Sequence, residues 1–356
     1  MNSYADIQLD GVWFSAGTIH RFSEIDPEAS WRQAIVQFLE EWFNREDYLT
    51  VQTSGSTGTP KTIRLLKQSM LNSARMTCSF FDLSKDQTAL LCLPVDNIAG
   101  KMMLVRAMVA GFNLLTVKPA GNPFTEVHCV VDFAAVTPFQ LISSHHTLRE
   151  KTIRKLIVGG SPVSQKLQKI TDNLDTEIYE TYGMTETCSH IALRRLNGGA
   201  PDEFFIALPG VEIGQDERKR LIINVPDIAN FRIITNDVVE IPGKSQFKWI
   251  GRFDHVINSG GIKLFAEQIE KKLETIINCC FFIGSLPDDK LTEKVVLVIE
   301  GPEWSESDLA KLNKDLKTVL TPFEIPRSIH FTESFATTSS GKVLKPEILR
   351  KLNALI

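Results

Sequence analysis

The sequence predicts an α/β fold: a large N-terminal domain with a mainly parallel sheet and a small antiparallel, barrel-like part, then a small α+β C-terminal domain. Apolar strand-like runs alternate with helical patterns up to about residue 181, and such alternation is typical of parallel sheets. From about Arg218 short strands follow one another between turn residues, and after Gly251 helices and strands mix. We therefore expect one domain over residues 1–253 and a second over residues 254–356.

The parallel part is expected to carry helices between its strands. Runs rich in branched and aromatic residues indicate the strands, at Tyr48–Gln52, Ala89–Leu93, Asn113–Val117, Leu156–Val158 and Glu177–Thr181. Apolar residues at helical spacing indicate amphipathic helices, at Leu66–Phe81, Lys101–Ala110 and Val163–Leu174.

The remaining elements are expected in an antiparallel sheet or small barrel and in the C-terminal domain. The strands of the antiparallel sheet or barrel are expected at Leu221–Val225, Arg232–Ile234, Val238–Ile241 and Phe247–Ile250. The C-terminal domain should combine helices at Ala266–Ile277, Asp308–Leu320 and Pro346–Leu355 with strands at Cys279–Ile283, Lys294–Ile299 and Arg327–Phe331.

The composition excludes several classes of protein. A formal net charge of −4 over 356 residues gives no electrostatic reason to expect a nucleic-acid partner. No apolar run reaches the roughly 18–20 residues of a membrane span, and the first residues lack the pattern of a signal peptide. The six cysteines show no CxxC pair and no metal-ligand spacing, so we expect a reduced, cytoplasmic protein.

A glycine-rich segment follows the first expected strand and reads TSGSTGTPKT over residues 53–62. Backbone N–H groups and hydroxyls in such loops hold phosphate oxygens, and a lysine adds positive charge. The segment is not a Walker A loop, because Pro60 stands where that pattern requires glycine. By itself it fits both a phosphate clamp of another type and an ordinary polar surface loop.

Three later segments favour the phosphate clamp. They read YGMTET over residues 182–187, GRFD over 251–254 with Gly260, Gly261 and Glu270 behind it, and TSSGK over 338–342. In order, the four segments resemble the phosphate loop, the YGxTE motif, the hinge region and the C-terminal T-x-SGK motif of the adenylate-forming superfamily. The resemblance covers residue 48 to the C-terminus, and the subdomain that precedes the loop in that family looks largely missing here.

The resemblance implies an ATP site. The loop residues should hold the β- and γ-phosphates, the turn after residue 158 and the YG pair should lie beside adenine, and an Asp and an Arg should contact the ribose. The residues so matched are Thr53, Ser54, Gly55, Ser56, Thr57, Gly58, Lys61, Gly159, Gly160, Ser161, Tyr182, Gly183, Asp237 and Arg252. A plain strand-to-helix turn at Gly159, a core role for Tyr182 and a structural role for Asp237 are the alternatives.

The same resemblance implies how the reaction runs. Lys342 should reach the acyl carboxylate and the α-phosphate during adenylation, Thr185 should contact the α-phosphate, and Glu186 should bind Mg²⁺. Coenzyme A is the expected second substrate, admitted after the C-terminal domain rotates about a hinge at Asp254. The expected residues of its channel are Gly260, Gly261 and Lys263.

The acid is suggested by the string YGMTETCS, which looks most like the o-succinylbenzoate–CoA ligases of menaquinone synthesis. His190 stands where these ligases often have Gln, and Asn97 where they commonly have His, so both are expected at the acid. Thr137 and Ser189 complete the expected acyl site. Two basic residues could pair with a second carboxylate, although a place on a helix surface is expected for both: Lys101 and Arg106. Other aryl or short-chain acids are alternatives.

Two further classes stay open. One is an adenylation enzyme that loads a carrier protein, although no carrier motif follows in the chain. The other is a degenerate ligase that only binds, against which the joint presence of Lys61, Glu186, Asp237 and Lys342 argues. A homodimer is an open alternative for the surface that the missing subdomain would cover.

Overall fold

The computed structural model describes residues 4–53, 61–199, 201–229, 231–337 and 343–354. Its centre is a run of parallel strands inside a 13-stranded sheet. In spatial order these are β9 (Glu177–Gly183), β8 (Ile153–Val158), β7 (Val131–Val136), β5 (Thr88–Leu91), β6 (Asn113–Thr116) and β1 (Asp6–Leu9). The expected fold class, with its mainly parallel sheet, is confirmed.

Antiparallel strands extend this sheet on both sides. β2 (Val12–Ser15) pairs with β1 at one edge. Beyond β9 come β10 (His190–Arg195), β11 (Phe205–Ala207), β15 (Gln246–Arg252), β14 (Ile233–Gly243), β13 (Arg220–Asn224) and β12 (Glu212–Gln215). The antiparallel part is therefore hydrogen-bonded directly to the parallel part. The strands expected at Arg232–Ile234 and Val238–Ile241 form one strand, β14.

Helices cover both faces of the parallel strands. Successive side chains of a strand point to opposite faces of the sheet, so each face has its own core. Phe133 and Ala135 of β7 pack in one core with α3 (Lys67–Phe81) and α4 (Ile98–Ala110). Ala134 and Val136 pack on the other face with α5 (Pro138–Leu148) and α6 (Gln165–Thr171). In the described ranges no helix has both the length and the apolar character needed to cross a membrane.

The first fifty residues contain ordered elements that the sequence analysis did not predict. α1 (Arg21–Glu24) and α2 (Ser30–Phe43) follow the β1–β2 hairpin, and buried α2 residues such as Leu39 and Trp42 join the larger core. The expected strand at 48–52 is β3 (Tyr48–Thr53), which pairs only with β4 (Lys61–Leu66) in a separate two-stranded sheet. The strand thus belongs to a hairpin around residues 54–60 and lies outside the parallel sheet.

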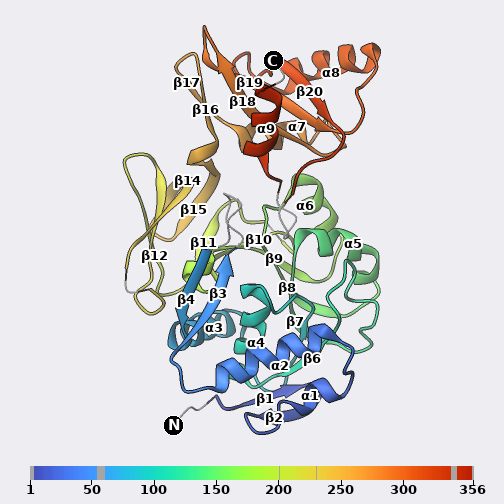
Figure 1. Cartoon of the computed structure of the whole chain (residues 1–356), viewed down its shortest axis with the longest axis vertical. Coiled ribbons are helices and arrows are strands. Elements are labelled where there is room, and N and C mark those ends of the chain that lie inside the picture. Colours follow the sequence, from blue (N-terminus) through green and yellow to red (C-terminus); the bar gives the residue numbers. More distant parts are fainter. Residues whose placement is uncertain (1–3, 54–60, 200, 230, 338–342, 355–356) are drawn as a thin grey trace.

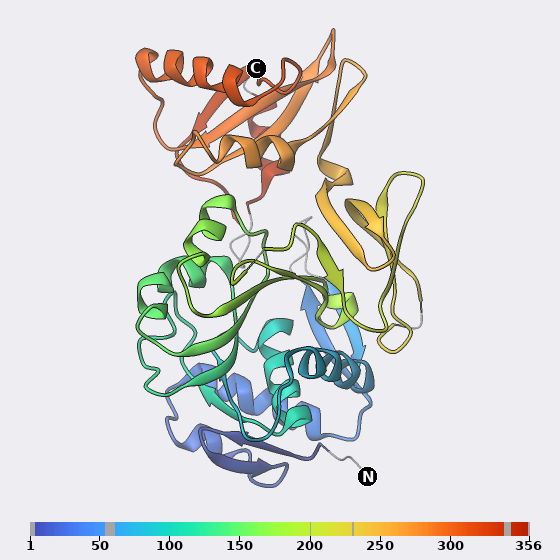
Figure 2. The same cartoon turned by 180° about the vertical axis from the view of Figure 1, so that it is seen from behind.

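The second sheet follows a 3-10 turn, η2 (Phe253–His255), and has five strands. They are β16 (Val256–Ser259), β17 (Ile262–Phe265), β18 (Phe281–Asp288), β19 (Thr292–Glu300) and β20 (Ser328–Thr332). α7 (Ala266–Leu273) and α8 (Glu306–Val319) share one core with this sheet, whereas α9 (Lys345–Asn353) packs on its other face. Figure 1 shows this part above the large sheet, and Figure 2 shows the same arrangement from behind.

Candidate active site

The ribose-binding candidates meet where β9 lies beside the antiparallel strands. The hydroxyl of Tyr182 donates to Oδ2 of Asp237 at 2.6 Å, and the indole N–H of Trp249 donates to Oδ1 at 3.1 Å. A carboxylate accepts about four hydrogen bonds, so Asp237 retains acceptor capacity for two ribose hydroxyls. Burial, and then the charge of Asp237, raise the pKa of Tyr182 well above 10, so the phenol stays a donor. The residue set fits the nucleoside it was expected to bind.

Trp249 was missed by the sequence analysis. Trp249 reaches Asp237 because β14 and β15 form a hairpin, in which Val239 pairs with Trp249 and Asp237 pairs with Arg252. Predicting this contact from the sequence requires the register of the hairpin, which is interrupted by shifts on both sides of residue 239. Asn236, the residue before Asp237, is not among the residues with positive φ, so no left-handed turn is needed there.

Arg252, the second expected ribose contact, is engaged with the expected hinge residue. Its Nε and Nη2 donate to the two oxygens of Asp254, each at 2.9 Å. Burial alone would raise the pKa of Asp254, but the hydrogen bonds and charge of Arg252 outweigh it and hold that pKa below its ordinary value. This pair spans the junction between the last strand of the large sheet and the first strand of the second sheet.

The turn expected beside adenine is fitted closely against β9. A Cβ atom on Gly159 would lie 2.2 Å from Oγ1 of Thr181, so only glycine fits without displacement. Gly160 has a φ of +94°, and Ser161 is exposed on the same turn. The residues after the turn are attached to β9, because Oε1 of Glu180 accepts from the backbone N–H of Val163 at 2.9 Å. Its open backbone suits contact with a planar base.

Thr185 and Glu186 lie on a short 3-10 helix, η1 (Thr185–Thr187), directly after β9. The chain reverses tightly here: a Cβ on Gly183 would lie 2.3 Å from the carbonyl oxygen of Ser189. Glu186 is exposed, and in the described ranges no three His, Cys, Asp or Glu side chains gather as a metal site. One carboxylate combined with substrate phosphates is a usual Mg²⁺ environment, so Glu186 fits that role.

Several predicted site residues cannot be placed. Ser54, Gly55, Ser56, Thr57, Gly58 and Lys342 lie outside the described residues. The backbones of Thr53 and Lys61 end β3 and begin β4, and they pair with each other across the hairpin. The segment expected to bind phosphate therefore lies between two antiparallel strands.

A buried polar cluster lies behind the expected acyl site. Arg106 on α4 is 1% exposed, so the expectation of a helix-surface position is wrong. Its Nη2 donates to Oγ of Ser189 at 2.6 Å, while its Nε has no hydrogen-bond partner among the described residues. Burial lowers the pKa of Arg106 to about 10, which still leaves the guanidinium charged at neutral pH. Both ring nitrogens of His190 lie within hydrogen-bond distance of hydroxyls, those of Ser189 and Thr77. Lys101 instead turns to α2, where Nζ lies 5.0 Å from the ring centroid of Phe38.

The other two acyl candidates begin helices. Asn97 is exposed at the N-cap of α4 and makes no side-chain cap. Thr137 caps α5 in a reciprocal pair: its Oγ1 accepts from the backbone of Gln140, and the Gln140 side chain accepts from the backbone of Thr137. The hydroxyl of Thr137 therefore already serves the helix, a structural role that the sequence analysis missed.

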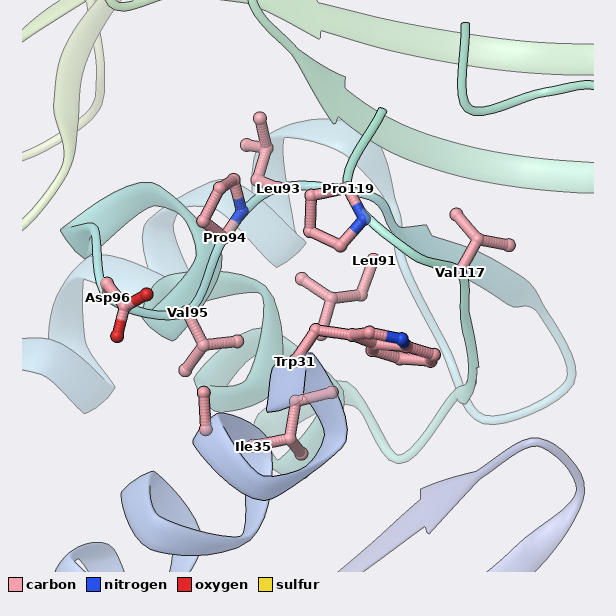
Figure 3. Close-up of a pocket in the computed structure, with 10 residues that line it drawn as sticks. Trp31, Ile35, Leu91, Leu93, Pro94, Val95, Asp96, Val117 and Pro119 are labelled. Carbon is pink, nitrogen blue, oxygen red and sulfur yellow. The ribbon is translucent and has the colours of Figure 1, made fainter. Parts of the chain in front are cut away.

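A small apolar pocket of about 40 Å³ opens between α2 and the carboxyl ends of β5 and β6. Figure 3 shows Trp31 and Ile35 of α2 facing Leu91 and Val95 across it. Ligand pockets are typically ~300–1,000 Å³, so this space by itself is too small for an aromatic acid. It adjoins a more open hollow of about 430 Å³, which shares Trp31, Pro94 and Pro119 with it.

The expected coenzyme A residues lie on the β16–β17 hairpin. Gly260 and Gly261 form its turn with φ of +59° and +81°, and Lys263 is exposed on β17. Figure 1 places this hairpin in the upper part of the molecule, above β14 and β15. In this arrangement the hairpin lies apart from β9 and η1, so its role at coenzyme A stays a prediction.

Comparison with known proteins identifies the family. The family model described as "AMP-binding enzyme" matches residues 10–213. This chain belongs to the AMP-binding enzyme family. A solved acyl-CoA synthetase (AMP-forming)/AMP-acid ligase II-like protein from Dyadobacter fermentans is 35% identical, with a TM-score of 0.61, and the match covers 95% of this chain and 99% of that one.

Other members of the AMP-binding family are more distant. Feruloyl-CoA synthase from Amycolatopsis is 26% identical over 85% of this chain and 69% of its own length. The 2-succinylbenzoate–CoA ligase of Bacillus mycoides is 24% identical over 88% of this chain and 72% of its own. The o-succinylbenzoate CoA synthetase structure from Bacillus subtilis, in complex with an acyl-adenylate intermediate, shares the fold with a TM-score of 0.72 at 19% identity over 84% of this chain and 68% of that one. The expected enzyme class, an adenylate-forming acyl-CoA synthetase, is confirmed.

Proposed function

We propose that this AMP-binding enzyme converts an aromatic dicarboxylic acid, with o-succinylbenzoate as the leading candidate, to its coenzyme A thioester. The observation that carries the proposal is the buried Arg106. A buried cation without a carboxylate costs several kcal/mol, and among the described residues the hydrogen-bond partners of Arg106 are a serine hydroxyl and the sulfur of Met103. A carboxylate of the substrate would supply the missing negative charge. Similarity to 2-succinylbenzoate–CoA ligase supports this choice of acid.

The proposed reaction has two half-reactions. A carboxylate oxygen of the acid attacks the α-phosphorus of ATP and pyrophosphate leaves, which gives the acyl-adenylate. The thiol of coenzyme A then attacks the acyl carbon and AMP leaves, which gives the thioester. Bound Mg²⁺ would neutralise phosphate charge, and Glu186 is the residue placed to hold it.

Residues of this chain divide the work in the first step. Asp237, oriented by Tyr182, holds the ribose, the turn at Gly159 receives adenine, and Thr185 contacts the α-phosphate. Lys342, on sequence grounds, neutralises charge between carboxylate and phosphate. We also propose that residues 254–356 form a separate domain that rotates about Asp254 between the two steps, and that the enzyme works in the cytoplasm, where ATP and coenzyme A are available.

The test is pyrophosphate release from Mg·ATP with a panel of acids, each with and without coenzyme A. The panel holds o-succinylbenzoate, ferulate, benzoate, a medium-chain fatty acid and amino acids. Turnover with o-succinylbenzoate that needs coenzyme A for a sustained rate is the expected result. A preference for ferulate would replace o-succinylbenzoate by ferulate as the proposed substrate. A preference for amino acids would indicate an enzyme that loads a carrier protein. Inactivity with every acid would favour a protein that only binds.

A further inference from the structure

We infer that His190 and Thr77 are positioning residues for acid selection, because they orient the Ser189 hydroxyl that holds Arg106 in place. This inference rests on the proposed function, since it assumes that Arg106 binds a second carboxylate of the acid. Neither residue needs to touch the acid. Thr77 lies on α3, remote in sequence from the segments that match the family motifs.

The residues form one continuous hydrogen-bonded chain. Nη2 of Arg106 donates to Oγ of Ser189 at 2.6 Å, and this Oγ lies 3.3 Å from Nδ1 of His190. Nε2 of His190 lies 3.2 Å from Oγ1 of Thr77, which donates to the carbonyl oxygen of Ser73 at 3.2 Å. Arg106, His190 and Thr77 are buried, with 1%, 6% and 0% of their surfaces exposed, so water does not compete for these groups.

One direction of donation satisfies every hydrogen bond in the chain. A guanidinium only donates and a carbonyl only accepts. The hydroxyl of Thr77 gives its hydrogen to Ser73, so it accepts from Nε2–H of His190. Nδ1 is then an acceptor and takes the hydrogen of Ser189, which leaves the lone pairs of Ser189 for Arg106. A neutral imidazole is required, and burial, followed by the charge of Arg106, lowers the pKa of His190 well below 6.5.

The direction of donation along these hydrogen bonds explains how His190 and Thr77 hold the guanidinium of Arg106. If His190 could not accept, the hydroxyl of Ser189 would lose the partner that fixes its orientation toward Arg106. The guanidinium would then be held less firmly by its one oxygen acceptor among the described residues and would shift from its position. Nε of Arg106 is buried and has no hydrogen-bond partner among those residues, so one donor of the guanidinium is unused. A shift of the Arg106 guanidinium would weaken the binding of a carboxylate, because bidentate pairing depends on geometry.

The experiment compares matched variants with matched acids. Thr77→Val replaces the hydroxyl by a methyl group of similar shape, and Thr77→Ser keeps the hydroxyl. His190→Leu removes both ring nitrogens, and His190→Gln keeps one acceptor and one donor. The acids are o-succinylbenzoate and two analogues that each lack one carboxylate, 4-oxo-4-phenylbutanoate and 2-butanoylbenzoate.

Thr77→Val and His190→Leu should raise KM for o-succinylbenzoate roughly fivefold to tenfold, the effect of about one lost hydrogen bond. The value of kcat should change less than about twofold, because the reacting groups are untouched. KM for the analogue that still reacts should not change, Thr77→Ser should behave like the wild type, and His190→Gln should raise KM less than His190→Leu does. A KM that is unchanged, or that rises equally for diacid and analogue, would overturn the inference.

Failure of the proposed function has a different signature. A wild-type enzyme with no preference for the diacid over both analogues would remove the proposed function, and this inference with it. A wild-type enzyme that prefers the diacid, together with variants that keep the preference, would remove only the inference. Thermal melts accompany each assay, and if the His190→Leu protein does not fold, the Thr77 pair and His190→Gln decide the outcome.

Discussion

Asp237, the residue proposed to bind the ribose, is held by side chains from strands that are distant in sequence. Tyr182 comes from the parallel part of the sheet, whereas Trp249 and Asp237 come from an antiparallel hairpin. Hydrogen bonds to a charged group contribute more than neutral ones, about 1.5–3 kcal/mol. The orientation of the carboxylate, and with it the ribose contact, therefore depends on two neutral donors.

Tyr182→Phe is expected to raise KM for ATP about threefold to tenfold, because Asp237 loses the donor that orients it. The loss of kcat should be smaller, since the phenol does not touch the reacting phosphorus. Pyrophosphate release at varied ATP concentration measures both parameters. Tyr179→Phe is the control, because this tyrosine lies on the same strand with its hydroxyl 3.4 Å from Glu177. Equal KM values in the two variants would contradict the role of Tyr182.

Glu186→Gln is expected to raise the Mg²⁺ concentration needed for half-maximal activity by about tenfold, because an amide keeps the shape but loses the charge that a hard cation prefers. Titration of activity with Mg²⁺ at fixed ATP measures the change. Removal of the metal by a chelator should abolish turnover in wild type and variant alike. Glu150→Gln, at an exposed acid after α5, is the control. An unchanged Mg²⁺ requirement would exclude Glu186 as the metal ligand.

At the scale of elements, the site depends on how closely β8 and β9 approach at their carboxyl ends. The turn after β8 passes so near Thr181 that Gly159 has no room for a side chain. The side chain of Thr181 is itself held in place, because its hydroxyl donates to the carbonyl oxygen of Val158 at 3.2 Å. The adenine turn is thus supported by the register of two parallel strands.

Gly159→Ala is expected to raise KM for ATP about tenfold, because the new Cβ would lie 2.2 Å from Oγ1 of Thr181 and must displace the turn. Adding Thr181→Ala removes that oxygen and should restore much of the ATP affinity, a coupling expected of residues in contact. Gly243→Ala is the control, since a Cβ there meets nothing within 4 Å. Additive effects of the two substitutions would show that the contact is unimportant.

At the scale of the whole molecule, two sheets meet at η2. The side chain of Gln268 on α7 donates to the carbonyl oxygen of Ile250 on β15 at 2.7 Å. The backbone N–H of Gln165 on α6 donates to the carboxylate of Glu274 at 2.9 Å. These contacts join the two sheet units in the arrangement of Figure 1, and they must break if residues 254–356 rotate as proposed.

Asp254→Pro is expected to spare adenylation and to slow thioester formation at least tenfold, because proline restricts φ at the proposed hinge and breaks the pair with Arg252. Lys342→Ala should show the opposite pattern: adenylation falls and thioester formation from a supplied acyl-adenylate is kept. Separate assays of the two half-reactions measure both variants. Equal damage to both steps in either variant would contradict the two-state mechanism.

The sequence by itself determined the reaction class and the fold class. Motif order and spacing are local properties, so TSGSTGTPKT, YGMTET, GRFD and TSSGK could be recognised without a structure. Two helices of the parallel part, α3 and α4, were also predicted, and their boundaries fall within three residues of those expected, whereas α5 was not predicted. β7 was missed although it lies in the middle of the sheet, because a strand buried on both faces shows no alternation and Asp132 interrupts its apolar run.

Only the tertiary structure decided which side chains meet. Trp249 joins Asp237 through the register of a bulged hairpin, and Thr77 joins Arg106 through the packing of α3 and α4 against the start of β10. Burial of Arg106 was missed although α4 is apolar on all sides, a pattern that indicates a buried helix. Which side chains surround the guanidinium is decided by packing alone. Contacts between residues distant in the chain are fixed by strand pairing and helix packing, and no local pattern encodes them.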